Sequence, residues 1–383
     1  MIKKIHIKNY KSLKDVDLEL NKVNVLVGPN MSGKSSLLDC FKFLSNICNL
    51  AYGVNGALNI RGGFAEIVWK GEESGPISFS VTVELAPDEY EYELSINGNP
   101  ATGTFSVERE DLKVKTGDKA FPLIDITNGQ GKVMHKDGRD AFGLPGNNAS
   151  ILQFVVPGWE GMSFKDYIKS WNFYNFMTID MKLPNSATSQ PFLVEDGSNF
   201  SSWFMTLQTT YPTEFSMIKQ VVRDVLPDIE EILTPPTQTG TTHMITREKY
   251  LKRSVLLPHM SDGEILFLAL LSLIFAPAQL RASLLGFEEL ENHLHPRLFE
   301  VFVELLSQRQ RELGTQAPQI IITTHSPYLV DRFKLDDIVV IEKRNGATQC
   351  TRPASKTYLK KLLEREELGL GDLLYSGALG NDK

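Results

Sequence analysis

The amino-acid sequence predicts an α/β protein with a mixed sheet flanked by helices and interrupted by an insertion. The almost wholly apolar run "VNVLV" is typical of a strand buried on both faces, and the glycine-rich stretch "GPNMSGKSS" follows it. Helices and strands alternate again from about residue 254. The segment between the first helix and residue 254 begins with apolar residues at every second position. We therefore expect residues 1–63 and 254–383 to form one domain that encloses an insertion, 64–253, made of an antiparallel β-meander and a helical subdomain.

The N-terminal part is predicted to form strands and then one helix. The stretches "IHIKNY" and "VDLEL" alternate apolar with polar residues, as strands with one buried face do. In "KSSLLDCFKFLSNI", the positions Leu37, Leu38, Phe41 and Leu44 recur at helical spacing. The glycine-rich stretch thus connects a strand to an amphipathic helix.

The insertion changes its pattern along its length. Apolar residues alternate with polar ones over 77–96 before an Asn-Gly turn, which predicts the β-meander. Residues 116–150 are rich in Gly, Asn, Asp and Lys and are expected to be loops, and 164–233 is predicted to be helical. The aromatic residues of this part fit a core, which we favour, or a partner surface: Trp159, Trp171, Phe173, Tyr174 and Phe176.

Composition and charge limit the class of protein. The 383 residues are 42% hydrophobic and 23% charged, which is enough for a sizeable core. A net charge of −7 argues against a surface dominated by basic patches, although a local groove could still bind nucleic acid. The three scattered cysteines fit reduced thiols, and neither a signal peptide nor an apolar stretch of bilayer length is evident. We expect a cytoplasmic protein without membrane contact.

Residues 28–36 have the spacing of a loop that binds phosphate. Gly28 and Gly33 allow unusual backbone angles and a close approach to phosphate oxygens. The following helix directs its positive N-terminal end at the same anion. Lys34 would reach the β- and γ-phosphates of a nucleotide, and the Ser35 hydroxyl would ligate Mg²⁺. The other residues expected to contact the nucleotide here are Pro29, Asn30, Ser32 and Ser36.

The stretch "MSDGEILFLALLSLIF" supports two interpretations. Ser261 with Glu264 three residues later is the pattern of a capping box, so the stretch could simply begin a buried helix. Alternatively, Ser261, Gly263 and the helix N-terminus bind a γ-phosphate. In a chain that also carries a phosphate loop, we favour the second interpretation.

Two further stretches place polar side chains at the ends of apolar strands. "ASLLGFEELENHLHP" ends a strand with Glu288 and Glu289, at the edge where open α/β sheets bind ligands. One acid, Glu288, would hold Mg²⁺, and Glu289 would activate the attacking water. In "IIITTHSP", His325 follows another apolar strand and would lie level with these acids if the strands are neighbours; a lone histidine at such a position is more often structural.

The order of these four motifs resembles that of ABC-type ATPases of the SMC/RecF/OLD branch. "GPNMSGKSS", "MSDGE", "FEELENHLHP" and "IIITTHSP" look like Walker A, the ABC signature, Walker B with the D-loop, and the switch histidine. The double acid is similar to that of OLD-like and related prokaryotic ATPases labelled AAA, and the chain also resembles Septu-type and retron-associated defence ATPases. The resemblance covers roughly residues 1–45 and 254–342.

The sequence departs from this family pattern at several positions. Glu288 stands where many relatives have Asp, Leu290 replaces a usual proline, and the signature lacks a second glycine. A Q-loop glutamine is not evident, Gln153 being a weak candidate. Neither a nuclease segment nor an SMC-type coiled coil is evident.

The resemblance implies a dimer in which two chains sandwich two ATP molecules with Mg²⁺. Lys34 and Ser35 of one chain and Ser261 and Gly263 of the other would hold each γ-phosphate, with Glu289 and His325 acting on it. We expect an ATPase that controls a separate effector such as a nuclease, in prokaryotic anti-phage defence. The alternative is a RecF-like DNA-binding ATPase in DNA repair; a transporter subunit or a small-molecule kinase fits the sequence less well.

Overall fold

The computed structural model describes residues 1–71, 75–292, 294–353, 359, 369–376 and 378–379, and the chain forms two compact units. Unit 1 comprises Met1–Trp171, Gln319–His325 and Lys334–Lys383, and unit 2 comprises Asn172–Pro318 and Ser326–Phe333. These bounds differ from the predicted segments 1–63, 64–253 and 254–383. The difference arises because the β-meander pairs with the first strand of the chain and so belongs to unit 1.

An eight-stranded antiparallel sheet forms a large part of unit 1. Its first strand, β1, pairs with β2 on one side and with β4 on the other, so the meander extends the N-terminal hairpin. In spatial order the strands are β2 (Leu13–Glu19), β1 (Ile2–Tyr10), β4 (Ile77–Leu85), β5 (Asp88–Gly98), β6 (Phe105–Thr116), β7 (Lys119–Thr127), β8 (Gln130–Met134) and β9 (Asp140–Phe142).

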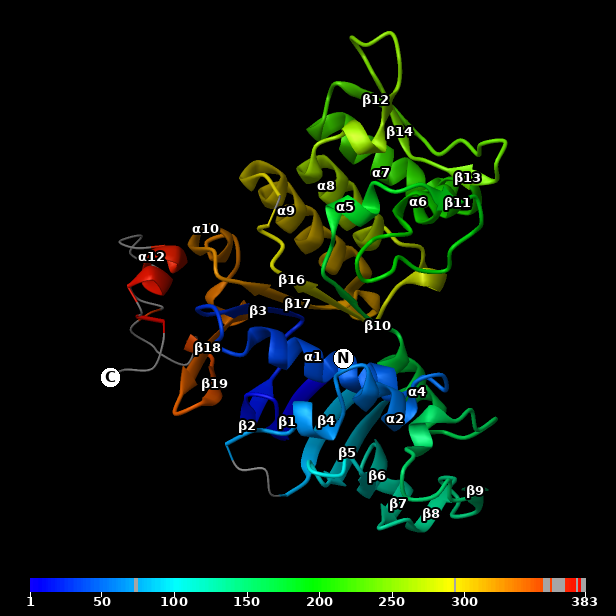
Figure 1. Cartoon of the computed structure of the whole chain (residues 1–383), viewed down its shortest axis with the longest axis vertical. Coiled ribbons are helices and arrows are strands. Elements are labelled where there is room, and N and C mark those ends of the chain that lie inside the picture. Colours follow the sequence, from blue (N-terminus) through cyan, green and yellow to red (C-terminus); the bar gives the residue numbers. More distant parts are fainter. Residues whose placement is uncertain (72–74, 293, 354–358, 360–368, 377, 380–383) are drawn as a thin grey trace. The chain divides into compact units, whose positions relative to one another are not determined.

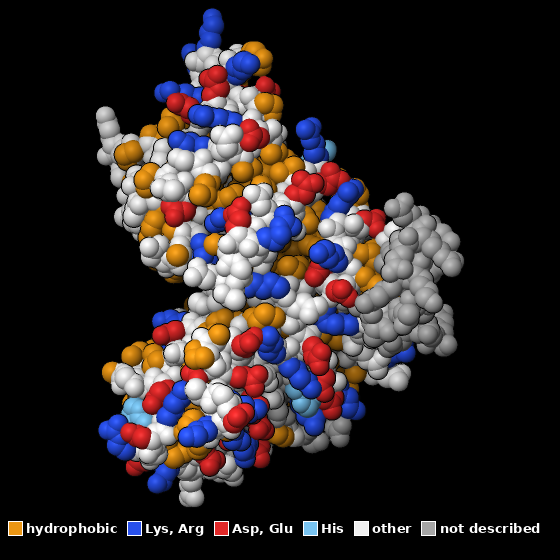
Figure 2. All heavy atoms as spheres, turned by 180° about the vertical axis from the view of Figure 1, so that it is seen from behind, with side chains coloured by type: hydrophobic (Ala, Val, Ile, Leu, Met, Phe, Trp, Pro, Cys, Tyr) orange, Lys and Arg blue, Asp and Glu red, His pale blue; other side chains and the backbone are white. Residues whose placement is uncertain are grey.

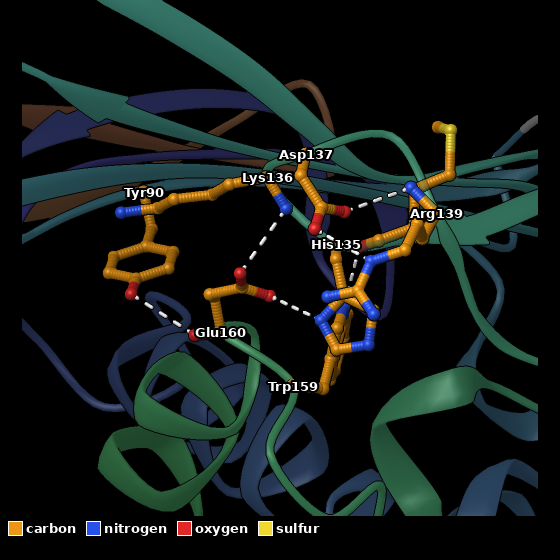
Figure 3. A network of polar contacts seen from close by, with 8 residues as sticks. Tyr90, His135, Lys136, Asp137, Arg139, Trp159 and Glu160 are labelled. Atoms are coloured by element: carbon orange, nitrogen blue, oxygen red, sulfur yellow. Dashed lines mark hydrogen bonds and ion pairs between the residues drawn. The ribbon is translucent and has the colours of Figure 1, made fainter.

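The segment 116–150, expected to be loops, contains the strands β7, β8 and β9, so that prediction was wrong for about half of its residues. Besides the ladder from β7 to β9, two side chains of the segment before α4 (Met162–Lys169) hold this region. Trp159 Nε1 donates to the Met134 carbonyl (2.9 Å), and the Glu160 carboxylate accepts from the Lys136 backbone N–H (3.3 Å) and lies 3.0 Å from His135 Nδ1 (Figure 3). Polar composition concealed these strands because one of their faces stays in water.

A second group of strands in unit 1 surrounds β3 (Val23–Val27). β17 (Gln319–Thr324) and β18 (Ile338–Arg344) flank β3 in parallel, and β19 (Ala347–Thr351) pairs antiparallel with β18. β17 is buried along its whole length and β3 nearly so, as their apolar runs predicted. Parallel and antiparallel pairs therefore occur together, which confirms the mixed sheet.

Helix α1 (Lys34–Ile47) lies between the two groups of strands (Figure 1). On one side its Phe43 ring packs against Tyr10 of β1 and Phe79 of β4, with ring centroids 5.6 and 5.4 Å apart. On the other side α1 contacts β17. The remaining helices of the described part of unit 1 are α2 (Gly53–Asn59), α3 (Phe64–Ile67), α4, α12 (Leu370–Tyr375) and the 3₁₀ turns η1 (Ile151–Gln153) and η5 (Leu335–Asp337).

A half-buried carboxylate on α1, Asp39, links the helix to its surroundings. It accepts hydrogen bonds from the Tyr10 hydroxyl (2.6 Å) and from Arg61 Nε (2.9 Å), and it pairs with Lys11. Burial by itself would raise the pKa of Asp39, but hydrogen bonds and charge from Arg61, and then from Lys11, hold it below its ordinary value. The network joins β1, α1 and the segment after α2.

Unit 2 is mainly helical. Its longest apolar helix, α8 (Asp262–Ile274), is buried all round from Ile265 onward, and Trp203 Nε1 donates to Ser272 Oγ in its interior (2.9 Å). The neighbouring strands β10 (Trp171–Tyr174) and β16 (Leu284–Glu288) also belong here. The other elements are α5 (Thr178–Met181), β11 (Asn185–Ser186), α6 (Phe200–Thr210), α7 (Pro212–Val225), β12 (Ile229–Leu233), β13 (Thr241–Thr242), β14 (Ile245–Glu248), β15 (Val255–Leu256), η2 (Leu257–His259), η3 (Ala278–Leu280), α9 (Pro296–Leu313), η4 (Gly314–Gln316) and α10 (Pro327–Val330).

Most of the aromatic cluster in the insertion is core, as we favoured. Trp159, Trp171, Phe173 and Tyr174 are buried, and the Tyr174 ring stacks on Phe287 of β16 at 5.7 Å. Within the described residues, no helix combines the length and hydrophobicity that a membrane span requires.

We expect Asp39→Ala to lower the free energy of unfolding of unit 1 by about 3 kcal/mol, because it leaves the buried Arg61 guanidinium and Tyr10 hydroxyl without their acceptor. The pKa of Asp39 is lowered in the folded state, so its ionised carboxylate stabilises the fold fully at pH values above the ordinary carboxyl pKa. This stabilisation is lost as the pH falls through the lowered pKa. Urea denaturation at pH 7 measures the change. The matched control is Asp15→Ala, which removes an exposed ion pair with His6 and should have little effect. Equal losses in both variants would contradict the role of Asp39.

Candidate functional site

Residues 28–33 connect β3 to α1 and pass close to two neighbouring strands. A Cβ atom on Gly28 would lie 2.1 Å from the carbonyl oxygen of Ile341, in β18. A Cβ atom on Gly33 would lie 2.0 Å from Thr348 Oγ1, in β19, and Gly33 has a φ of +111°. Neither position accepts a side chain, which explains the two glycines of the motif.

The loop presents several hydrogen-bond donors to one place. Gly33 is the N-cap of α1 and has no side chain with which to cap the helix, and a helix N-terminus is a favourable place for an anion. Lys34 is buried and its Nζ donates to the carbonyl oxygens of Gly28 (2.8 Å) and Pro29 (3.0 Å), so the ammonium group lies against the loop. Ser32 Oγ is buried and has no hydrogen-bond partner among the described residues. Backbone N–H groups, a hydroxyl and an ammonium group together suit phosphate oxygens.

The outer residues of the loop are accessible. Pro29, Asn30 and Ser35 are exposed, and Ser36 is half-buried, in the first turn of α1. The Ser35 hydroxyl therefore lies at the helix start, where it can meet a ligand from solvent.

Two residues that the sequence analysis missed hold the loop from behind. The Thr348 hydroxyl is buried; it donates to the carbonyl oxygen of Ser32 (2.9 Å) and lies 2.8 Å from Ser12 Oγ. The Thr348 backbone N–H also donates to the Ser12 carbonyl (2.8 Å). No sequence pattern connects these residues, because more than 300 positions separate Thr348 from the other two.

The strand register places His325 beside the start of the loop. Thr324 of β17 pairs in parallel with Val27 of β3. The next residues along the two strands, His325 and Gly28, therefore leave the sheet side by side. His325 is exposed, so its ring is accessible.

The two acids occur in unit 2, at the end of β16. Glu288 is the last residue of the strand and is half-buried. Glu289 follows with a φ of +48°, a left-handed conformation that costs a residue with a side chain about 1–2 kcal/mol. Asn292 Nδ2 donates to Glu289 Oε2 (2.9 Å) and thereby orients the carboxylate. Such backbone strain is concentrated at functional sites.

Ser261 forms the capping box that its sequence suggested. Its Oγ accepts from the Glu264 N–H (3.3 Å), and its own N–H donates to Glu264 Oε2 (3.0 Å). The residue is nevertheless exposed at the N-terminus of α8, and Gly263 is half-buried in the first turn. The structural interpretation of Ser261 is therefore correct, and it leaves the helix end accessible to an anion.

The structure thus groups the predicted residues in two sets. The phosphate loop, residues 28–36, and His325 are in unit 1, whereas Ser261, Gly263, Glu288 and Glu289 are in unit 2. Gln153 lies in η1 with its side chain against Gly53 and remains a prediction. Within the described ranges, no cluster of three or more His, Cys, Asp or Glu side chains could hold a metal ion alone.

One sequence family matches this chain. The family described as "AAA domain, putative AbiEii toxin, Type IV TA system" matches residues 23–331, from β3 to the end of α10. This range contains all four motifs. No sequence among the curated proteins gives a significant match.

Solved structures of SMC heads share the fold. An SMC head bound to the C-terminal winged-helix domain of ScpA has a TM-score of 0.55 at 14% identity, covering 91% of this chain and 97% of that one. The head domain of Smc with an extended coiled coil, bound to the C-terminal domain of ScpA derived from Pyrococcus furiosus, has a TM-score of 0.51 at 13% identity, covering 95% and 99%. These similarities confirm the predicted α/β fold, which this chain shares with SMC heads.

We expect Thr348→Val, which keeps the shape but removes the hydroxyl, to weaken nucleotide binding about five-fold, because the Ser32 carbonyl loses its donor and the loop becomes less ordered. Thr348→Ser keeps the hydroxyl and should bind nearly as the native protein does. Calorimetric titration with a non-hydrolysable ATP analogue measures both. Equal affinities for the Val and Ser variants would show that the hydroxyl does not support the loop.

Proposed function

The chain belongs to the AAA-domain family described as "putative AbiEii toxin, Type IV TA system", and on that premise we propose that it binds and hydrolyses ATP, pairs head-to-tail with a second copy, and controls an effector protein. The observation that carries the proposal is the phosphate loop. Its helix start without a side-chain cap, its buried Lys34, and its buried Ser32 hydroxyl, which has no hydrogen-bond partner among the described residues, suit a triphosphate.

The residues present also suit Mg²⁺. A magnesium ion bound with ATP keeps most of its ligands as water and phosphate oxygens, so it needs few protein ligands. Ser35 offers an exposed hydroxyl at the start of α1, and Glu288 offers a carboxylate at the end of β16. When bound, the ion would neutralise charge on the β- and γ-phosphates.

Glu289 is the proposed general base. Its carboxylate, oriented by Asn292, would take a proton as the water oxygen bonds to the γ-phosphorus. The bond from that phosphorus to the oxygen of the β-phosphate breaks, and ADP and inorganic phosphate leave. His325, beside the start of the phosphate loop, would donate a hydrogen bond to the γ-phosphate.

The signature residues would contact the nucleotide bound by the second copy. Ser261 and Gly263 lie at an accessible helix N-terminus, which would bind the γ-phosphate held by the other chain's loop. ATP would then favour the paired state, and hydrolysis would release it. A change from 1:99 to 99:1 requires about 5.5 kcal/mol of differential binding, which two triphosphates contacted by both chains can supply.

The biological role of this ATP-dependent pairing is proposed from the comparisons and from the motif resemblance. The family description names a putative toxin of a type IV TA system, and the two SMC heads were solved with a domain of another protein bound. The bound domains fit an ATPase whose conformation a separate protein recognises. A nuclease as that protein, and a role in prokaryotic anti-phage defence, are proposed from the motif resemblance to OLD-like ATPases. The alternative, a RecF-like DNA-repair ATPase, requires an electropositive surface. Acidic and basic side chains are interspersed over the face drawn in Figure 2, and the net charge is −7.

We expect Glu289→Gln to lower ATP hydrolysis by roughly 100-fold or more while keeping ATP bound, since only the proton acceptor is lost. The variant should then form a persistent dimer with ATP, measured by light scattering. The matched control is Glu304→Gln, an exposed acid on α9, which should hydrolyse ATP normally. A Glu289→Gln protein that stays monomeric at saturating ATP would refute the shared site.

The effector hypothesis predicts that a second protein co-purifies with tagged Glu289→Gln protein in ATP, and less so with native protein in ADP. The repair hypothesis predicts instead that ATP induces duplex DNA binding whose affinity falls steeply with salt. Mass spectrometry of the purified complex and filter binding at several salt concentrations separate the two. Strong ATP-dependent DNA binding without any protein partner would favour repair.

A further inference from the structure

Met31, in the phosphate loop, combines an unfavourable backbone with a very exposed side chain. Its φ is +64°, a conformation that glycine adopts freely and that costs other residues about 1–2 kcal/mol. Its side chain is 86% exposed, so packing within the chain does not offset that cost. A residue of this kind in a binding loop suggests a contact that forms only with another molecule.

A second exposed apolar site lies beside the signature. Thr178 of α5 donates from Oγ1 to the Asp262 carboxylate (3.0 Å), and Lys182, directly after α5, donates from Nζ to the other oxygen (2.6 Å). Asp262 is the residue between Ser261 and Gly263, so α5 is fixed against the signature. Thr178 is buried, which adds to the rigidity of this contact.

The outward side of this segment is apolar. Met177, Ile179 and Leu183 are 49%, 81% and 52% exposed, and together they form what we call the α5 patch. Single exposed apolar residues are ordinary on protein surfaces, but three within seven positions beside a proposed ligand contact are not explained by chance scatter alone. Because Thr178 and Lys182 hold this segment against Asp262, we infer that a molecule that contacts the signature also reaches the α5 patch.

We propose that the α5 patch of one copy docks on the phosphate loop of a second copy, at Met31. This proposal rests on the proposed function, in which Ser261 faces the triphosphate held by the other chain's loop. Met31 belongs to that loop, and Thr178 and Lys182, which are sequence neighbours of the α5 patch residues, bond to the residue next to Ser261. In this arrangement both apolar sites border the same shared ATP. Burying them on pairing adds apolar contact to the charge contacts of the phosphates.

Lys182 and Thr178 act in this arrangement as positioning residues. They fix the direction of Asp262, and hence of the signature, relative to the patch. Lys182→Ala should weaken ATP-dependent pairing without changing the affinity of the monomer for ATP, and Lys182→Arg should restore part of the pairing.

The first test measures dimerisation of Glu289→Gln protein in ATP by analytical ultracentrifugation. Ile179→Asp should weaken the dimer about ten-fold or more, because a carboxylate would be buried at two symmetry-related contacts. The control is Leu50→Asp, which is 67% exposed but lies beyond the far end of α1 from Met31, and it should leave the dimer unchanged. Equal dimer strength for Ile179→Asp and the parent would overturn the proposal.

The second test links the two sites directly. Met31→Cys and Ile179→Cys are combined with Glu289→Gln and Cys350→Ser; the other native thiols, Cys40 and Cys48, are buried. A short bis-maleimide should join two chains in ATP but not after Ser261→Arg is added. A dimer that forms in ATP yet gives no cross-link would refute the α5 contact alone, whereas absence of any ATP-dependent dimer in the Glu289→Gln parent would refute the proposed function.

Discussion

Helix α1 is held between two groups of strands by an aromatic contact on one side and by the half-buried carboxylate of Asp39. Its N-terminus is at the same time the end of the phosphate loop. The direction of the helix axis, and so of its dipole, is fixed by this packing before any ligand arrives. A preorganised helix end loses little entropy on binding, which is why the loop can use backbone groups as donors.

The strands around α1 also fix the shape of the phosphate loop. Parallel pairing with β3 places the end of β17 level with the start of the loop, and β18 and β19 approach its glycines so closely that no side chain fits. Thr348 adds a hydrogen bond from the far end of the sequence. The loop is thus supported by segments that are distant along the chain, and its shape depends on the complete fold of unit 1.

Two positions for which we propose functions adopt backbone conformations that their side chains disfavour. Met31 and Glu289 both have positive φ angles, one in the phosphate loop and one after the acidic strand. A folded protein retains such strain where the surrounding structure imposes it and where function benefits. For Glu289 the benefit is the direction of a carboxylate held by Asn292. For Met31 we attribute it to the second copy.

Local motifs allowed much to be predicted from the sequence. The strand β3, the phosphate loop and α1 are contiguous, and their apolar periods and glycine spacing follow from local backbone geometry. The same holds for β16 with its acids, for β17 and for the capping box at Ser261. Other features appear only in the tertiary structure. They are the strands between 116 and 150, the hydrogen bonds of Ser12 and Thr348 that support the loop, the hydrogen bonds from Thr178 and Lys182 to Asp262, and the position of His325 beside Gly28. The strands between 116 and 150 pair with near neighbours in the sequence, but their polar composition resembles that of loops. The other three features join residues far apart along the chain, and such contacts are set by packing and strand register, which leave no periodic trace in the sequence.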